Sequence, residues 1–372
     1  MKNNNVMGVV FANVHDDLIR ELTEVRSTAS VPFGGRYRLI DFPLSNMVNA
    51  GISKVGVIPK YNYHSLMDHL GSGKPWDLDR KSGGLSILPP YVTSNVSMQT
   101  GHIDSLSTIM SYLRGSKEKY IVMCDADVIG NINIENILKD HYRSGADITI
   151  AYKNGPLPKS NRDIMSFEMN DCGRVTKIRL SENYGVTCNF SLDVVVMERA
   201  LLMDLVKGAL EENMSRMWRD VFAAKVDSLK IHGYEVKEFA LVIDGTESYA
   251  NANFALLNPK IRAELFNPER PIYTKNRDDV PTRYGLNSAV KNCLIADGCV
   301  IEGEVSNCVI FRGVKIEEGA KLSNCIIMQD SIVKKDADLK YVITDKNTEI
   351  TEGRALCGAP THYMSIRKSA TV

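Results

Sequence analysis

Aspartates follow several short apolar runs in the first two thirds of the chain. Asp125 and Asp127 come directly after Tyr120–Cys124, Asp244 follows another apolar run, and the acidic segment 11–18 follows the first one. If these runs are parallel strands, their ends lie at the edge of the sheet where ligands bind. Carboxylates there can hold Mg²⁺ for phosphoryl or nucleotidyl transfer. The alternative is that the aspartates cap helices and turns.

The elements expected to position these aspartates alternate along the chain. Apolar runs rich in β-branched residues predict strands, and amphipathic runs predict helices. The predicted strands are Val6–Ala12, Val55–Pro59, Tyr120–Cys124 and Ile148–Tyr152, and the predicted helices are Ile40–Asn49, Tyr61–Leu70, Ile103–Leu113 and Ile132–His141. This alternation indicates an α/β fold with a Rossmann-like, mostly parallel sheet covered on both faces.

The C-terminal part has a different pattern, an internal repeat. Its copies are 292–295 (N-C-L-I), 307–310 (N-C-V-I), 324–327 (N-C-I-I) and 340–343 (K-Y-V-I), spaced by 15, 17 and 16 residues. Such a repeat predicts the coils of a parallel β-helix, in which each coil buries its apolar residues against the next. We expect Cys293, Cys308 and Cys325 to fill its interior rather than bind a metal. The predicted division is a domain at 1–257, a linker at 258–284 and the β-helix at 285–372.

Composition narrows the classes of function. The 372 residues include 45 lysines and arginines and 45 aspartates and glutamates, so the basic excess of a nucleic-acid-binding protein is missing. No apolar run is long enough to span a membrane. Residues 1–5 lack a signal-peptide pattern, and the eight cysteines are widely spaced. We therefore expect a cytoplasmic protein that binds neither nucleic acid nor membrane.

A long motif carries a resemblance to a known family. Residues 31–46 read V-P-F-G-G-R-Y-R-L-I-D-F-P-L-S-N, followed by N-A-G-I at 49–52 and Y-N-Y-H-S-L-M-D-H-L at 61–70. In these segments the chain resembles the glucose-1-phosphate adenylyltransferase (ADP-glucose pyrophosphorylase) family. The resemblance implies a nucleotidyltransferase domain followed by a left-handed parallel β-helix. It also implies the family reaction, in which ATP and glucose 1-phosphate give ADP-glucose and pyrophosphate with Mg²⁺.

The chain departs from the family in the loop that binds phosphate. Catalytic members carry A-G-G-x-G-T-R-L after the first strand, whereas 12–19 here reads A-N-V-H-D-D-L-I. Asn13, Val14 and Asp16 replace the glycines, and their side chains obstruct the approach of phosphate to the backbone. The carboxylates of Asp16 and Asp17 are expected to repel a triphosphate. Thr28 replaces a lysine of the family.

The resemblance also assigns candidate site residues. Asp127 matches the first metal-binding aspartate and is the remaining candidate for a catalytic role. The second metal ligand is apparently absent, because Asp244 is out of phase by one or two residues and would face the other way. Gly101 and Asp104 are placed in the nucleotide- and sugar-binding region. The family's sugar-phosphate motif falls near 180–182, where no lysine is present.

Together these losses resemble the regulatory D-type subunit that accompanies a catalytic subunit in some Gram-positive bacteria, in a heterotetramer that makes ADP-glucose for glycogen. We therefore expect a catalytically weak or inactive subunit whose partner is a catalytic glucose-1-phosphate adenylyltransferase. Mg²⁺ serves the family reaction but is not expected to bind this chain productively. Two alternatives stay open: a competent adenylyltransferase with a modified phosphate loop, and a non-enzymatic sensor of sugar phosphates or nucleotides.

Two arginines suggest a regulatory anion site. Arg26 and Arg38 lie on either side of the 31–35 motif, and in bacterial relatives basic residues at matching positions contribute to a sugar-phosphate effector site. Guanidinium groups suit phosphate recognition. The alternative is that both arginines make ordinary ion pairs. Pro32 stands where some relatives have a basic residue, so the effector or its affinity is expected to differ.

Overall fold

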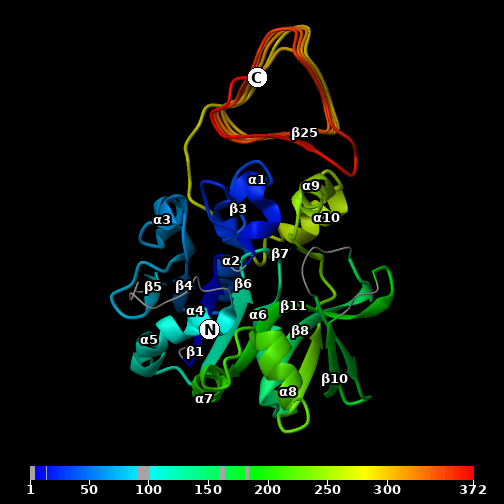
Figure 1. Ribbon diagram of the computed structural model, residues 1–372. Helices are drawn as coiled ribbons and strands as arrows, with labels where there is room; N and C mark the ends of the chain where they lie inside the picture. Colours follow the sequence, from blue (N-terminus) through cyan, green and yellow to red (C-terminus); the bar gives the residue numbers. More distant parts are fainter. Residues whose placement is uncertain (1–4, 14, 90–100, 159–163, 181–183) are drawn as a thin grey trace.

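The N-terminal part of the computed structural model is built on one large sheet with helices on both faces (Figure 1). The structure describes residues 5–13, 15–89, 101–158, 164–180 and 184–372. Within these residues the sheet has nine strands in the order β10-β9-β11-β6-β1-β4-β5, with β8 and β12 joined beside β11. The strands are β1 (Val6–Phe11), β4 (Lys54–Ile58), β5 (Gly84–Ile87), β6 (Tyr120–Asp125), β8 (Ile148–Pro156), β9 (Met165–Met169), β10 (Val175–Leu180), β11 (Thr187–Glu198) and β12 (Ile231–Glu235).

The central strand β1 explains why the first apolar run is continuous. Val6 and Val10 pack on one face of the sheet, whereas Met7, Val9 and Phe11 pack on the other. β1 pairs in parallel with β4 and β6, and β4 with β5. β11 runs antiparallel to β6 and β8. The predicted mostly parallel α/β sheet is confirmed.

The helices cover both faces of this sheet. Helices α2, α3 and α6 contribute to the apolar cluster on one face, and α4, α5 and α7 to the cluster on the other. The helices are α1 (Arg20–Thr23), α2 (Asp41–Asn49), α3 (His64–Leu70), α4 (His102–Thr108), α5 (Met110–Gly115), α6 (Ile134–Ser144), α7 (Arg199–Glu211), α8 (Ala223–Lys225), α9 (Thr246–Ala255) and α10 (Pro259–Leu265). Among the described residues, no helix has the length and apolar character needed to cross a bilayer.

Three predicted helices differ from the structure by more than one residue in their bounds. The predicted helix 61–70 begins only at His64. The predicted helix 103–113 is interrupted at Ile109, where φ is −101° and ψ is 11°, and so forms α4 and α5. The predicted helix 132–141 begins at Ile134 because the Asn133 side chain accepts a hydrogen bond from the Asn136 backbone amide and caps it. It continues to Ser144 and ends at Gly145, whose φ is 58°.

The C-terminal part is a parallel β-helix, drawn in Figure 1 as a stack of triangular coils. Within 283–366, all of it described, the strands form three five-stranded parallel sheets. One contains β14 (Arg283–Tyr284), β17 (Val300–Ile301), β20 (Lys315–Ile316), β23 (Ile332–Val333) and β26 (Glu349–Ile350). The second contains β15 (Ala289–Lys291), β18 (Glu304–Ser306), β21 (Lys321–Ser323), β24 (Asp338–Lys340) and β27 (Ala355–Cys357). The third contains β16 (Leu294–Ile295), β19 (Val309–Ile310), β22 (Ile326–Ile327), β25 (Val342–Thr344) and β28 (Met364–Ile366).

The sequence repeat coincides with one corner of this β-helix. Asn292, Asn307 and Asn324 turn the corner with φ values of 51°, 52° and 53°, a left-handed conformation that asparagine tolerates better than most residues. The apolar residues that follow each asparagine form strands of the third sheet. Cys308 and Cys325 are fully buried between the coils, and Cys293 is partly buried, as the interior position predicts. The repeat therefore encodes both the corner and the filling of the coil.

The third sheet of the β-helix packs on the N-terminal part through an apolar cluster. Phe311 and Met328 of the β-helix join Phe33, Phe42 and Tyr249, all fully buried. A buried ion pair, Arg26 Nη1 to Asp345 Oδ1 at 2.9 Å, crosses the same contact. The predicted linker 258–284 includes α10 and β14, and the division at 257 and 285 stays a prediction.

Replacing Phe311 by alanine tests whether this cluster holds the two parts together. We expect Phe311→Ala to lower the free energy of unfolding by about 3–5 kcal/mol, because it removes a large buried ring and leaves a cavity. Tyr284→Ala is the matched control, since Tyr284 is an aromatic residue exposed in the first coil. Urea unfolding curves that shift equally for both variants would contradict the interface.

Candidate functional site

A histidine and two aspartates converge beyond the ends of β1 and β6. The strands pair in parallel with Phe11 opposite Asp125, so the segments that follow them emerge side by side. His15 Nδ1 lies 2.8 Å from Asp127 Oδ2 and 3.7 Å from Asp125 Oδ2. Among the described residues this is the only group of three or more histidine, cysteine or acidic side chains whose ligand atoms all lie within 4.8 Å of one another. The predicted Asp127 is therefore part of a cluster with His15 and Asp125.

Asp125 is held in place by a second histidine. His102 Nε2 lies 3.0 and 3.2 Å from the two carboxylate oxygens of Asp125, and both side chains are buried. The His102 ring packs edge-on to Phe11 and against Trp218. The position of the Asp125 carboxylate is thus set by α4 as well as by β6.

The loop after β1 is closed by its own polar side chains. Asp16 is buried, and its Oδ1 accepts hydrogen bonds from the backbone amide and the hydroxyl of Thr28 at 2.7 and 2.6 Å. Its Oδ2 accepts a third from Asn13 Nδ2 at 2.5 Å. Burial raises the pKa of the Asp16 carboxyl, while these hydrogen bonds act in the opposite direction. The loop has turned this carboxylate inward, where Thr28 and Asn13 bind it.

This arrangement corrects part of the expectation for the acidic loop. Asp16 does not face the solvent where a triphosphate would approach; its carboxylate is an internal hydrogen-bond acceptor. Asp17 is the exposed member of the pair, with 82% of its side chain accessible. Val14, the second of the three replaced glycine positions, lies outside the described residues.

Gly101 and Asp104, predicted to contact nucleotide or sugar, begin helix α4. The Gly101 amide donates to Asp104 Oδ2 at 3.2 Å, which caps the helix. A Cβ at Gly101 would lie 2.0 Å from the Ser215 carbonyl oxygen, so only glycine fits there. Both residues have a structural task, and their role in ligand binding stays a prediction.

Strand pairing brings the backbone next to Asp244 close to that of Asp127, but the Asp244 side chain is not part of the cluster of His15, Asp125 and Asp127. β13 (Ala240–Val242) pairs with β7 (Val128–Gly130), and the Ile243 amide donates to the Asp127 carbonyl at 2.8 Å. Asp244 instead lines a pocket of about 680 Å³. Other residues of this pocket include Lys153, Phe190, Glu247, His362 and Tyr363, so the N-terminal part and the β-helix both contribute to it. The sugar-phosphate motif was expected near 180–182; Leu180 ends β10 (Val175–Leu180), and residues 181 and 182 lie outside the described residues.

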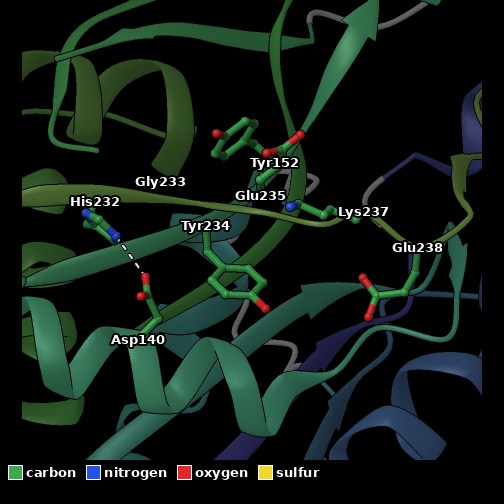
Figure 2. A pocket seen from close by; sticks show the side chains of 8 residues that line it. All are labelled: Asp140, Tyr152, His232, Gly233, Tyr234, Glu235, Lys237 and Glu238. Atoms are coloured by element: carbon green, nitrogen blue, oxygen red, sulfur yellow. Dashed lines mark hydrogen bonds and ion pairs between the residues drawn. The ribbon is translucent and has the colours of Figure 1, made fainter. Parts of the chain in front are cut away.

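Another pocket lies along the edge strand β12, away from the aspartate cluster. His232 Nε2 pairs with Asp140 of α6 at 2.8 Å. Figure 2 shows Tyr152 and Tyr234 on opposite sides of the strand, so the polar groups there do not converge on one point. The pocket is lined by Asp140, Tyr152, His232, Gly233, Tyr234, Glu235, Lys237 and Glu238. The arrangement of these side chains therefore does not indicate a particular reaction or ligand.

The two predicted effector arginines lie near a lysine of the β-helix. Arg26 pairs with buried Asp345, and Arg38 Nη1 donates to the carbonyl and hydroxyl oxygens of Ser65 at 2.6 and 2.9 Å. Burial, reinforced by the charges of Arg38 and Arg26, lowers the pKa of Lys346 to about 7. Sequence reasoning missed Lys346 because it lies about 300 residues along the chain from both arginines.

The aspartate cluster does not fit the magnesium site of the family reaction. Mg²⁺ takes oxygen ligands in octahedral geometry and keeps several waters. Here the imidazole nitrogen of His15 lies against Asp127, and Asp244 supplies no ligand atom to the cluster. His15 was not identified as a site residue from the sequence. The available signal was a histidine, a common metal ligand, in the acidic segment that follows a buried strand.

Comparison with known proteins agrees with the two-part architecture. A Nucleotidyl transferase family model matches residues 18–167, and a GlmU-like, C-terminal hexapeptide model matches residues 280–361. The fold is therefore a nucleotidyltransferase domain followed by a left-handed parallel β-helix of hexapeptide repeats, as predicted.

Relatives that match this chain over most of its length identify the family more closely. The chain is 36% identical to glycogen biosynthesis protein GlgD of Bacillus subtilis over 99% of this chain and 97% of that protein. It is 38% identical to GlgD of Geobacillus stearothermophilus, over 86% and 83%. It is 31% identical to the glucose-1-phosphate adenylyltransferase of Fervidobacterium nodosum, over 94% and 85%. The chain belongs to the glucose-1-phosphate adenylyltransferase family, which includes these GlgD proteins.

Removing the Asp16 carboxylate tests the closed loop. We expect Asp16→Ala to lower the free energy of unfolding by about 1–3 kcal/mol, because the buried Thr28 amide loses its acceptor. The neighbouring Asp17→Ala is the control and should change stability by less than about 0.5 kcal/mol, since Asp17 is exposed. Denaturant titration of the two variants measures this, and equal stabilities would show that the Asp16 contacts do not hold the loop.

Proposed function

We propose that this chain is a regulatory, catalytically weak or inactive subunit of ADP-glucose pyrophosphorylase in glycogen biosynthesis. Its partner is a catalytic glucose-1-phosphate adenylyltransferase subunit, with which it forms a hetero-oligomer. The observation that carries the proposal is the loop after β1, where the Asp16 carboxylate takes the hydrogen bonds of Thr28 and Asn13. The names of the GlgD relatives support the role in glycogen biosynthesis.

The geometry opposes catalysis in two ways. Nucleotidyl transfer depends on preorganised donors that stabilise negative charge on phosphate in the transition state. In this loop the Thr28 amide already donates to Asp16, and the family's lysine is replaced by Thr28 itself. His15 also lies against Asp127 Oδ2, and Asp127 is the residue that would serve a metal–nucleotide complex. The Thr28 amide and the Asp127 carboxylate, which could bind phosphate and metal, therefore already have partners within the protein.

A second candidate function has some structural support. The 680 Å³ pocket between the two parts of the chain is large enough for a sugar or a nucleotide. Its presence favours the sensor alternative, in which the chain binds a ligand without turning it over. Dependence on a catalytic partner separates the regulatory subunit from such a solitary sensor.

An assay of ADP-glucose synthesis distinguishes these functions. The pure chain should be slower than a catalytic relative by about three orders of magnitude, the effect of losing about 4 kcal/mol of transition-state stabilisation. Mixing it with the catalytic homologue should change the activity of that homologue. Comparable turnover by the pure chain, abolished by Asp127→Asn, would establish the competent enzyme instead. No change on mixing would contradict regulation.

The regulatory signal in this proposal is a sugar-phosphate effector bound by the cationic cluster, defined here as Arg26, Arg38 and Lys346. Arg26 and Arg38 come from the nucleotidyltransferase domain and Lys346 from the β-helix, so a bound anion would link the two domains. Asp345 competes with the anion for Arg26, because the two side chains are already paired. Arg38 and Lys346 are therefore the better positions for substitution, since Arg26→Ala would leave Asp345 buried without its partner.

Effector activation should depend on pH through Lys346. With a pKa of about 7, half of the Lys346 ammonium groups have lost their proton at pH 7 and nearly all of them at pH 9, so activation by fructose 1,6-bisphosphate should weaken over this range. The phosphates themselves stay ionised there, because their second pKa is about 6. The charges of Asp345 and Lys368 also act on Lys346, the first raising its pKa and the second lowering it.

Activation of the mixed complex should be measured with Arg38→Ala and Lys346→Met made in this subunit only. Arg38→Ala should raise the effector concentration needed at every pH, and Lys346→Met should remove the pH dependence. Arg354→Ala, an exposed arginine elsewhere in the β-helix, is the control. Activation curves that coincide with wild type for both cluster variants would rule out this site.

A further inference from the structure

We infer that His15, Asp125 and Asp127 form a binding site for a divalent transition-metal ion of the Mn²⁺ or Zn²⁺ class. This ion differs from the Mg²⁺ of the family reaction and requires no nucleotide. The inference does not depend on the proposed regulatory function, because it concerns binding of the metal alone.

Burial of negative charge is the first argument. The side chains of Asp125 and Asp127 are 2% and 3% exposed and lie beside the same imidazole. Buried carboxylates are costly unless a cation or several hydrogen bonds compensate them. Lys60 interacts electrostatically with Asp16, Asp104, Asp125 and Asp17, so its single charge is shared among four carboxylates. A divalent ion between Asp125 and Asp127 would compensate both carboxylates at once.

The ligand types select the metal. One imidazole nitrogen and two carboxylate oxygens suit Mn²⁺, Zn²⁺ and Co²⁺ better than Mg²⁺, which prefers oxygen alone. Neighbouring ligand atoms around a tetrahedral ion with bonds of 2.0–2.2 Å lie about 3.3–3.6 Å apart. The His15 nitrogen lies 2.8 and 3.7 Å from its two aspartate oxygens, on either side of that range. Small shifts of one side chain would therefore admit the ion.

The surroundings complete the site in the manner of protein metal centres. His102 contacts both oxygens of Asp125 and so orients a ligand from outside the cluster, as outer partners commonly do. The adjoining small pocket is lined by Phe11, Ala12 and Thr28 besides the ligands and has no room for a phosphate group. His15 is the ligand nearest the solvent, with 20% of its side chain exposed. An ion would enter past His15, and water would complete its coordination only from the solvent side of His15, because the small pocket itself has no space for a water molecule.

His15 also explains why this site belongs to this chain. It lies in the loop whose glycines are replaced, directly before Asp16. The hydrogen bonds of Asp16 to Thr28 and Asn13 hold the loop against the protein, which brings the His15 imidazole to Asp127. The change that closes the phosphate loop therefore supplies the nitrogen ligand.

Calorimetric titration of the metal-stripped full chain with MnCl₂, CoCl₂ and MgCl₂ tests the inference. We expect one site per chain that binds Mn²⁺ and Co²⁺ at least about tenfold more tightly than Mg²⁺. His15→Ala should weaken Mn²⁺ and Co²⁺ binding at least about tenfold, as removal of a ligand requires. His64→Ala, which removes an exposed histidine near the same edge of the sheet, should leave binding unchanged.

Two further measurements identify the ligands of the bound ion and show whether the His15→Ala variant folds. The visible spectrum of bound Co²⁺ should show nitrogen and oxygen ligands without thiolate, which excludes the cysteines as the site. Mn²⁺ should raise the melting temperature of the wild type but not of His15→Ala, which also shows whether the variant folds. Equal affinity for Mg²⁺, unchanged Mn²⁺ binding by His15→Ala, or lack of stoichiometric binding would overturn the site. If no stoichiometric binding is found, the His15 imidazole is the group that compensates the Asp127 carboxylate, in place of a metal ion.

Discussion

The buried Asp16 carboxylate and its hydrogen bonds fix the conformation of the loop after β1. A buried carboxylate requires donors, and it obtains them from the amide and hydroxyl of Thr28 and from Asn13. Donors engaged in this way are not free to bind a phosphate. The loop is also tied at its far end, where the Thr23 hydroxyl donates to the Asp16 carbonyl at 2.7 Å. The Asp16 side chain thus anchors the loop after β1 in the folded interior.

The same loop is continuous with the contact between the two domains. Thr28, which binds Asp16, is two residues from Arg26, whose guanidinium pairs with Asp345 of the β-helix. The chain then enters β2 (Pro32–Phe33), and Phe33 packs in the apolar cluster beneath the third sheet of the β-helix. A segment of a few residues therefore joins the cationic cluster to the loop after β1. This is a spatial path, and coupling along it requires two arrangements that an effector distinguishes.

Much of the fold could be predicted because its signals are local and repeated. The continuous apolar run of β1 reflects burial on both faces, and the asparagines at 292, 307 and 324 mark corners that need a positive φ. The site was harder to predict, because its parts come together only in three dimensions. His15 reaches Asp127 across 112 residues, and Lys346 joins the arginines from the other domain. The direction of Asp16 also could not be read from the sequence, since an aspartate in a loop is equally able to face solvent or turn inward to local donors.

The replaced glycine positions lie in a loop on which the pairing of the central strands does not depend. The pairing of β1 with β4 and β6 buries apolar side chains on both faces, whatever residues follow Phe11. The glycines of a phosphate loop serve the ligand, so replacing them costs the fold little once Asp16 finds donors. The contact with the β-helix is held by apolar packing that involves neither the nucleotide nor a metal. A chain built in this way can lose phosphate binding and keep every surface that an oligomer or an effector uses. This separation makes a regulatory subunit a physically accessible product of an enzyme fold.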